Sequence, residues 1–363
     1  MCLNHAIDRA FDTDRADAFA DRLVETLNHG ALTLMISVGH RTGLFDAMAD
    51  SQPRSSTMLA DRAGLDERYV REWLGAMTTG RIVDHDPETG NFLLPGEHAS
   101  FLSRESAADN IAVFAQYIPL LGSVEDDIVA CFRDGGGVPY DRFPRFHEVM
   151  AEDSGQSVLS SLFDHILPLV PGLEDRLEQG IEVLDLGCGQ GLALRALAER
   201  FPRSRFTGYD LSVQAVDEAR SMAGGLANLR FEARDLSDFD TSAEPAAFDL
   251  VTTFDAVHDQ ARPRALLAGI RRTLAPGGVY LMQDIHASSD VANNLDHPLG
   301  TLLYTVSTMH CMTVSLAQDG EGLGAMWGRE LAEVLLREAG FDAVEIHRLE
   351  HDIQNDYYVV RAD

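Results

Sequence analysis

Residues 181–191 read Ile-Glu-Val-Leu-Asp-Leu-Gly-Cys-Gly-Gln-Gly and contain the strongest indication of the fold in the sequence. Its apolar first half is typical of a buried parallel strand, and helix-forming residues from Leu192 to Arg200 follow directly. The glycines between them predict a tight turn that leads into a helix. We therefore expect backbone N–H groups and a helix N-terminus to point at a ligand here.

The spacing of Gly187, Gly189 and Gly191 narrows the kind of ligand. A dinucleotide-binding loop needs Gly-x-Gly-x-x-Gly, and Leu192 stands where its third glycine would lie. The spacing therefore argues against a nicotinamide or flavin dinucleotide. A glycine loop alone specifies little, so the rest of the chain has to support any assignment.

Strand-like and helical segments alternate after residue 181. The expected strands cover residues 183–186, 205–209, 229–233, 248–254 and 279–284. Alternation of this kind predicts a doubly wound parallel sheet. Residues 344–349 and 357–361 have no helix between them and predict an antiparallel hairpin at the sheet edge. We therefore expect an α/β fold with a seven-stranded, doubly wound, Rossmann-like sheet whose last strand is antiparallel.

A different pattern occupies the first 100 residues. It predicts a helix over 20–52, a short helix around Leu59, a second from Glu67 to Thr78, and a hairpin of 81–84 with 91–94. These elements make an α-helical winged-helix domain. Residues 55–95 contain seven acids and four arginines. That balance argues against a helix that reads a DNA groove and favours a dimerisation module.

Charge and composition limit the partners. The chain has 363 residues, a formal net charge of −29 and no lysine, which opposes binding to nucleic acid or to an anionic membrane. Its four cysteines lack Cys-x-x-Cys spacing, so we expect neither a disulfide framework nor a metal site. Residues 1–8 show no basic region followed by an apolar core, and we expect a cytoplasmic protein.

Acidic residues stand where the expected strands end, which is where ligands bind in open α/β sheets. Asp210 follows the glycines at about twenty residues, the distance at which an acid can accept both hydroxyls of a ribose. Asp235 can accept from an adenine amino group, with Leu236 beside the ring. The fourth strand ends at Phe254-Asp255.

Residues 181–285, from the glycine loop to Leu274-Ala-Pro-Gly-Gly278, resemble the class I S-adenosylmethionine (SAM) methyltransferases. The whole chain is similar to bacterial winged-helix methyltransferases and, more distantly, to plant small-molecule O-methyltransferases. The resemblance implies SAM as cofactor, S-adenosylhomocysteine as product, a small-molecule acceptor and a homodimer formed through the N-terminal domain. The cofactor contacts it implies are Asp185, Gly187, Cys188, Gly189, Asp210, Leu211, Asp235, Leu236 and Phe254.

On this interpretation the chain has three parts. A winged-helix dimerisation domain spans 1–100, a helical linker contributing to the pocket spans 101–180, and a SAM-binding methyltransferase domain spans 181–363. An insertion at 286–328 would roof the substrate pocket. The expected substrate residues in the linker and the insertion are Tyr140, His147, His286, His310 and Trp327.

His258 follows the fourth strand and is the candidate catalytic residue. An ordinary histidine pKa of about 6.5 suits a general base, and His258-Asp259 matches the His-Asp pair of the plant enzymes. Gln260 departs from the tryptophan usual after that pair, which puts a phenolic substrate in doubt. A structural pair that only caps the next helix is one alternative. Another is a SAM- or ligand-sensing winged-helix transcription regulator. The acceptor atom stays open among oxygen, sulfur and nitrogen.

Overall fold

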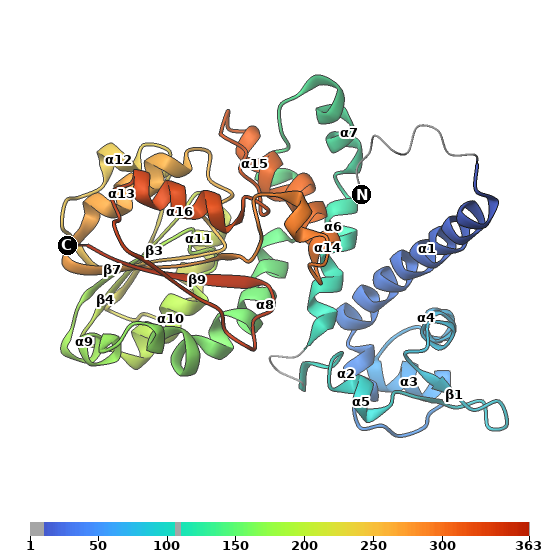
Figure 1. Cartoon of the computed structure of the whole chain (residues 1–363). Coiled ribbons are helices and arrows are strands. Elements are labelled where there is room, and N and C mark those ends of the chain that lie inside the picture. The colour runs from blue at the N-terminus through green and yellow to red at the C-terminus, as the bar shows by residue number, and fades with distance from the viewer. Residues whose placement is uncertain (1–10, 106–109, 363) are drawn as a thin grey trace. The chain divides into compact units, whose positions relative to one another are not determined.

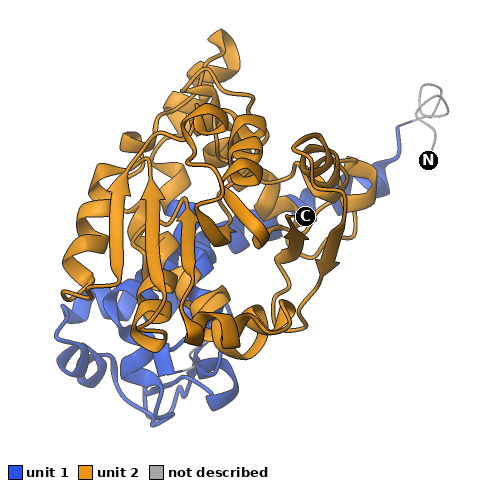
Figure 2. Ribbon diagram, turned by 90° about the vertical axis from the view of Figure 1, so that its left-hand side faces the viewer, with its two compact units in different colours: residues 1–119 blue, residues 120–363 orange. Residues whose placement is uncertain are grey.

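The computed structural model describes residues 11–105 and 110–362. The chain forms two compact units, residues 1–119 and residues 120–363 (Figure 2). Residues 1–8, in which we expected no leader, and Cys2 among them, lie outside the described part. In that described part, no helix is both long and apolar enough to cross a membrane.

The first unit contains the predicted helix-turn-helix and hairpin, the latter shortened to two residues in each strand. Its elements are α1 (Thr13–Thr42), α2 (Leu44–Met48), α3 (Ser56–Ala63), α4 (Glu67–Thr79), β1 (Asp84–His85), β2 (Phe92–Leu93) and α5 (Gly96–Ala99) (Figure 1). The predicted apolar face of α4, with Val70, Trp73, Leu74 and Met77, is buried.

The single helix expected over 20–52 is in fact two helices. Gly43 ends α1 with a φ of 73°, a left-handed conformation that glycine adopts without a Cβ penalty. Its N–H donates to the carbonyls of Gly39 and His40, which satisfies the end of the helix.

The second unit is built around one large sheet. Its helices are α7 (Glu125–Asp134), α8 (Phe146–Ser157), α9 (Leu173–Gln179), α10 (Leu192–Arg200), α11 (Val213–Met222), α12 (Phe239–Ser242), α13 (Pro263–Thr273), α14 (Gly300–Val306), α15 (Met312–Leu316) and α16 (Gly328–Glu338), with α6 (Tyr117–Gly122) before them. Its strands are β3 (Glu182–Leu186), β4 (Arg205–Asp210), β5 (Leu229–Ala233), β6 (Phe248–Phe254), β7 (Leu274–Ile285), β8 (Val344–His347) and β9 (Asn355–Arg361).

The seven strands have the order β5-β4-β3-β6-β7-β9-β8. Strands β3 to β7 are parallel, and β9 is antiparallel to both of its neighbours, as predicted. Alternate residues of each strand point to opposite faces, so Leu184 and Val251 pack with α12, α13 and α16. Val183 and Leu250 pack with α9, α10 and α11 on the other face (Figure 1).

The position of β3 in the sheet creates the place for a ligand. The chain first adds β4 and β5 on one side of β3 and then returns to place β6 on the other side. Connections therefore diverge at the carboxyl ends of β3 and β6. Such a switch point opens a crevice, and it is where open α/β sheets bind their ligands.

Candidate active site

A cavity of about 790 Å³ lies at the carboxyl ends of β3 to β6, entirely within the second unit. This volume falls in the range of small-molecule sites. All nine residues expected to contact the cofactor line the cavity: Asp185, Gly187, Cys188, Gly189, Asp210, Leu211, Asp235, Leu236 and Phe254. The cavity therefore gathers residues that are spread over seventy positions of the sequence, from 185 to 254.

The glycine loop has the backbone conformation that its sequence requires. Gly187, Gly189 and Gly191 have φ values of 74°, 52° and 69°, all in the left-handed region. A Cβ on Gly187 would lie 2.5 Å from the Cβ of Ala256, and one on Gly191 would lie 2.3 Å from the Phe231 ring. A Cβ on Gly189 would meet no atom within 4 Å. Two of the three glycines are thus needed for close packing as well as for the turn.

The N–H groups of this loop do not all point at a ligand as predicted. Gly187 and Cys188 both donate to the carbonyl of Tyr209, at 2.8 and 3.1 Å. Gly189 donates to Asp210 Oδ2 at 2.8 Å. The acceptors for these three N–H groups are the Tyr209 carbonyl and the Asp210 carboxylate at the end of β4, and these hydrogen bonds hold the loop in place. The loop therefore offers a shaped wall with few anion-binding groups, which further disfavours a pyrophosphate ligand.

Two acids of the cavity differ in their surroundings. Asp210 is half-buried, and its Oδ1 accepts from the N–H of Ser212 at 2.8 Å. Its carboxylate oxygens have further lone pairs to accept ligand hydroxyls. Asp185 is buried and accepts from Thr252 Oγ1 at 2.7 Å. Burial raises the pKa of Asp185 from 3.8 to about 7, so a cation in the cavity would stabilise its charged form.

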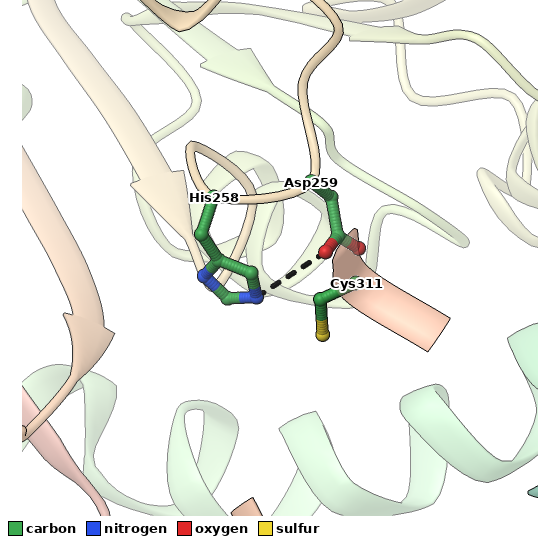
Figure 3. Close-up of side chains that lie close together, drawn as sticks. All are labelled: His258, Asp259 and Cys311. Atoms are coloured by element: carbon green, nitrogen blue, oxygen red, sulfur yellow. Dashed lines mark ion pairs between the residues drawn. The ribbon is translucent and has the colours of Figure 1, made fainter. Parts of the chain in front are cut away.

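His258 is buried behind the cavity and does not belong to its lining, whereas Asp259 does. His258 Nδ1 lies 2.7 Å from Asp284 Oδ1, and His258 Nε2 lies 3.4 Å from Asp259 Oδ1 (Figure 3). Burial opposes a charge on His258, but the carboxylates of Asp284 and Asp259 outweigh it and raise its pKa well above 6.5. The two carboxylates therefore favour the imidazolium form.

The predicted substrate residues divide into two groups. Tyr140 and His147 line the cavity, and the Tyr140 hydroxyl donates to Asp259 Oδ2 at 3.0 Å. His310 lies behind Phe146, with ring centroids 3.7 Å apart, and burial lowers its pKa to about 4.

The remaining two predicted substrate residues lie outside the cavity lining. Trp327 Nε1 donates to Asp284 Oδ1 at 2.9 Å and so supports the carboxylate that holds His258. His286 Nδ1 contacts Asp356 Oδ2 at 2.9 Å. Both side chains therefore have structural partners within the second unit.

Sequence reasoning missed Phe143 and Arg234 as lining residues. It placed Asp255 at the end of the fourth strand without giving it a ligand, and Asp255, directly after β6, lines the cavity. The aromatic residues at 140–147 were an available signal, since aromatic side chains dominate small-molecule sites.

Two sets of described side chains lie close enough to share a metal ion. They are His258, Asp259 and Cys311 (Figure 3), and Asp255, His258 and Asp284, with ligand atoms within 4.8 Å of one another. Burial raises the pKa of the Cys311 thiol to about 12. A metal in the first set would therefore have to displace a firmly held proton.

Comparison with known families covers both units. Residues 30–104 match the family model described as Rv2258c-like winged HTH domain, and residues 177–340 match the Methyltransferase domain. The chain is 30% identical over 144 residues to trans-aconitate 2-methyltransferase of Acidovorax sp. (strain JS42), covering 40% of this chain and 51% of that protein. It is 37% identical over 101 residues to ubiquinone biosynthesis O-methyltransferase of Idiomarina loihiensis, covering 27% and 40%. The matched part of the chain spans 51% of the first of these relatives and 40% of the second.

Solved structures resemble the chain over nearly its full length. Human N-acetylserotonin methyltransferase in complex with SAM has a TM-score of 0.67 at 17% identity, over 94% of this chain and 97% of that one. An O-methyltransferase family protein from Burkholderia thailandensis has a TM-score of 0.61 at 16% identity, over 98% and 99%. At these identities the likeness shows the fold. With both family models matched, the chain belongs to the class I SAM-dependent methyltransferases with an N-terminal winged-helix domain.

Proposed function

We propose that this protein transfers the methyl group of S-adenosylmethionine to an oxygen, sulfur or nitrogen atom of a small molecule. One observation carries the proposal: a single cavity at the switch point of the sheet gathers all nine residues expected to hold the cofactor. Two of the relatives are named as a trans-aconitate 2-methyltransferase and a ubiquinone biosynthesis O-methyltransferase. These names support methyl transfer to a small molecule as the reaction.

The geometry suggests an orientation for the cofactor. In the orientation we propose, the methionine part lies against Gly187 and Gly189, the ribose hydroxyls donate to Asp210, and the adenine lies by Asp235 and Leu236, all of which line the cavity. The acidic lining, which includes Asp185, suits the positive sulfonium. In the proposed division of the chain, the linker at 101–180 contributes Tyr140 and His147 to the lining of the cavity.

The base belongs to the His258–Asp259 pair in this proposal. Methyl transfer is a displacement in line with the sulfonium, so the protein mainly has to position the acceptor and exclude water. The pKa of His258 lies well above 6.5, so His258 favours its protonated form. In this proposal Asp259, which lines the cavity, accepts the proton of the methyl acceptor. His258 behind it stabilises the Asp259 carboxylate. A hydroxyl acceptor needs this pair, whereas a thiol, with an ordinary pKa of about 8.5, needs little help.

Calorimetry with S-adenosylhomocysteine tests the cofactor assignment. Wild-type protein is expected to bind it one to one, and Asp210→Ala to bind at least about 100-fold more weakly, because two ribose hydroxyls would each lose a hydrogen bond to a charged acceptor, at about 1.5–3 kcal/mol per bond. Asp240→Ala, which changes an exposed acid outside the cavity, is the matched control. Unchanged affinity in Asp210→Ala would show that the cofactor lies elsewhere.

The charge balance of α4 disfavours the alternative of a transcription regulator. On α4, the would-be recognition helix, Arg68 pairs with Glu72 at 2.5 Å and Arg71 pairs with Glu67 at 3.0 Å. Acids of the same helix thus neutralise its arginines. A groove-reading helix needs a net basic face, so the enzyme is the better proposal.

We also propose that the protein forms a homodimer through α1. Six large apolar side chains are exposed on this helix, Val24 among them, and the other five follow one another at spacings of four or seven residues: Phe19, Leu23, Leu27, Leu34 and Val38. These spacings place them along one face. An exposed apolar stripe of this length is typical of a protein interface. A second copy of the same helix would cover it with a self-complementary surface.

A further inference from the structure

Three side chains with metal-ligating atoms meet behind the cavity, and we call them the Cys311 cluster. His258 Nε2, a carboxylate oxygen of Asp259 and the Sγ of Cys311 lie within 4.8 Å of one another (Figure 3). His258 Nε2 and Asp259 Oδ1 are 3.4 Å apart. Ligand atoms that hold a tetrahedral zinc ion at about 2.0–2.3 Å lie roughly 3.3–3.8 Å from each other. The cluster is therefore within about 1 Å of the spacing that such an ion requires.

Hydrogen bonds to neighbouring residues orient the first two ligands. His258 Nδ1 lies 2.7 Å from Asp284 Oδ1, so Nε2 is the ring nitrogen that faces Asp259. Trp327 Nε1 donates to the same oxygen of Asp284 at 2.9 Å. Asp259 Oδ2 accepts from the Tyr140 hydroxyl at 3.0 Å, and Oδ1 is the oxygen toward His258. Histidine and carboxylate ligands of metal sites are normally held by hydrogen bonds of this kind.

A π-helical turn positions the third ligand. Cys311 is the last residue of the π-helix η9 (Ser307–Cys311), which lies between α14 and α15 in the chain. Such turns are rare and are frequent at functional sites. Cys131 and Cys188 belong to no set of close ligand atoms in the described part of the chain. Cysteine spacing predicted no metal site, because this cluster combines two segments that are far apart in the sequence, at 258–259 and at 311.

The charges of the cluster suit a divalent cation. The Asp259 carboxylate and a Cys311 thiolate together balance the charge of one zinc ion, which avoids an uncompensated charge in a buried place. Burial lowers the pKa of His258, but the acidic groups around it raise that pKa well above 6.5. The cluster therefore favours a positive charge. It adjoins the cavity through Asp259, which belongs to the cavity lining.

We propose that His258 Nε2, Asp259 Oδ1 and Cys311 Sγ form a binding site for Zn²⁺. The ion replaces the proton of the Cys311 thiol and the proton at His258 Nε2, and both protons are released to solvent. Three protein ligands leave the fourth tetrahedral position to a water molecule. Bound zinc occupies the atoms that accept and stabilise a proton in the proposed function, so it blocks methyl transfer to a hydroxyl group. This consequence rests on the proposed function, whereas the metal site itself does not.

Metal titration of the full chain, first freed of metal with a chelator, tests the site. Competition with a chromophoric chelator is expected to show one Zn²⁺ per chain with a Kd below about 10 µM. Co²⁺ adopts the geometry of zinc sites and makes the ligands visible by absorption. The Co²⁺ form is expected to show the visible bands of a tetrahedral site and a thiolate-to-cobalt charge-transfer band in the near ultraviolet.

Two ligand variants identify the residues, so that the comparison holds if one of them fails to fold, which circular dichroism shows. Cys311→Ser is expected to remove the charge-transfer band. His258→Gln is expected to weaken Zn²⁺ binding at least about 100-fold, since loss of a residue that only orients a ligand already costs about 10–100-fold. Cys131→Ser, at a partly exposed cysteine outside the cluster, is the matched control and should keep both the band and the affinity.

Three results would overturn the site: zinc binding weaker than about 10 µM, a Co²⁺ form without the charge-transfer band, or a band that survives Cys311→Ser. The affinity for S-adenosylhomocysteine is measured separately on the metal-free protein. Its loss would refute the proposed function and leave the metal site standing.

Discussion

Two single substitutions in the glycine loop, Gly187→Ala and Gly189→Ala, separate backbone strain from packing. Both glycines have left-handed φ values, so an alanine at either position is strained. Their surroundings differ, because the new Cβ at position 187 would lie 2.5 Å from Ala256 Cβ. The new Cβ at position 189 would have no neighbour within 4 Å.

The expected destabilisation follows from these contacts. A left-handed conformation costs a residue with a Cβ about 1–2 kcal/mol. Overpacking against a rigid neighbour adds about 1–3 kcal/mol, and Ala256 is rigid because it is buried directly after β6. Gly187→Ala should therefore lose about 2–5 kcal/mol of unfolding free energy, and Gly189→Ala about 1–2 kcal/mol.

Urea unfolding measures this difference. The chain has two tryptophans, Trp73 in the first unit and Trp327 in the second. In a Trp73→Phe background, the fluorescence of Trp327 reports the unit that contains the loop. Equal losses in the two variants, or a larger loss in Gly189→Ala, would refute the described packing of Gly187 on Ala256.

Three further predictions address charge, assembly and catalysis. Because burial raises the pKa of Asp185 from 3.8 to about 7, the native state keeps a proton that the unfolded state releases, so this group's contribution to stability falls as pH rises from about 4 to about 7. Asp185→Asn should flatten that dependence in urea unfolding at pH 5 and pH 8, and an unchanged slope would contradict it. Leu27→Glu places a charge on a side chain that is 74% exposed in the apolar stripe of α1, and sedimentation equilibrium should show a monomer where the wild type is a dimer. His258→Gln should lower kcat for a hydroxyl acceptor by about 100-fold and leave the affinity for S-adenosylhomocysteine unchanged; near-normal turnover would point to a thiol or an already ionised acceptor.

The sheet could be predicted from local sequence patterns, because these patterns depend only on residues that are close together in the sequence. Strand period, glycine spacing and the acid at each strand end lie within a few residues of one another, and the sheet order follows from the connections. The lining of the cavity by Asp210 and Asp235 follows directly, since parallel strands bring their carboxyl ends to one edge.

The features that local patterns did not predict depend on contacts between residues that are far apart in the sequence. His258 is held by Asp284, which is 26 residues away, and Trp327 reaches the same carboxylate from 43 residues away. No local pattern predicts that this pairing buries His258 behind Asp259. The loop donors were misjudged for the same reason, because the carbonyl of Tyr209 on the neighbouring strand accepts them.

A crystal structure of the protein with S-adenosylhomocysteine would show whether the cavity at the carboxyl ends of β3 to β6 holds the cofactor. We expect the ribose hydroxyls within hydrogen-bond distance of Asp210, the adenine beside Leu236, and the sulfur between Gly187 and Asp259. Ligand bound outside this cavity, or a cavity that stays empty at saturating S-adenosylhomocysteine, would rule out the proposed cofactor site.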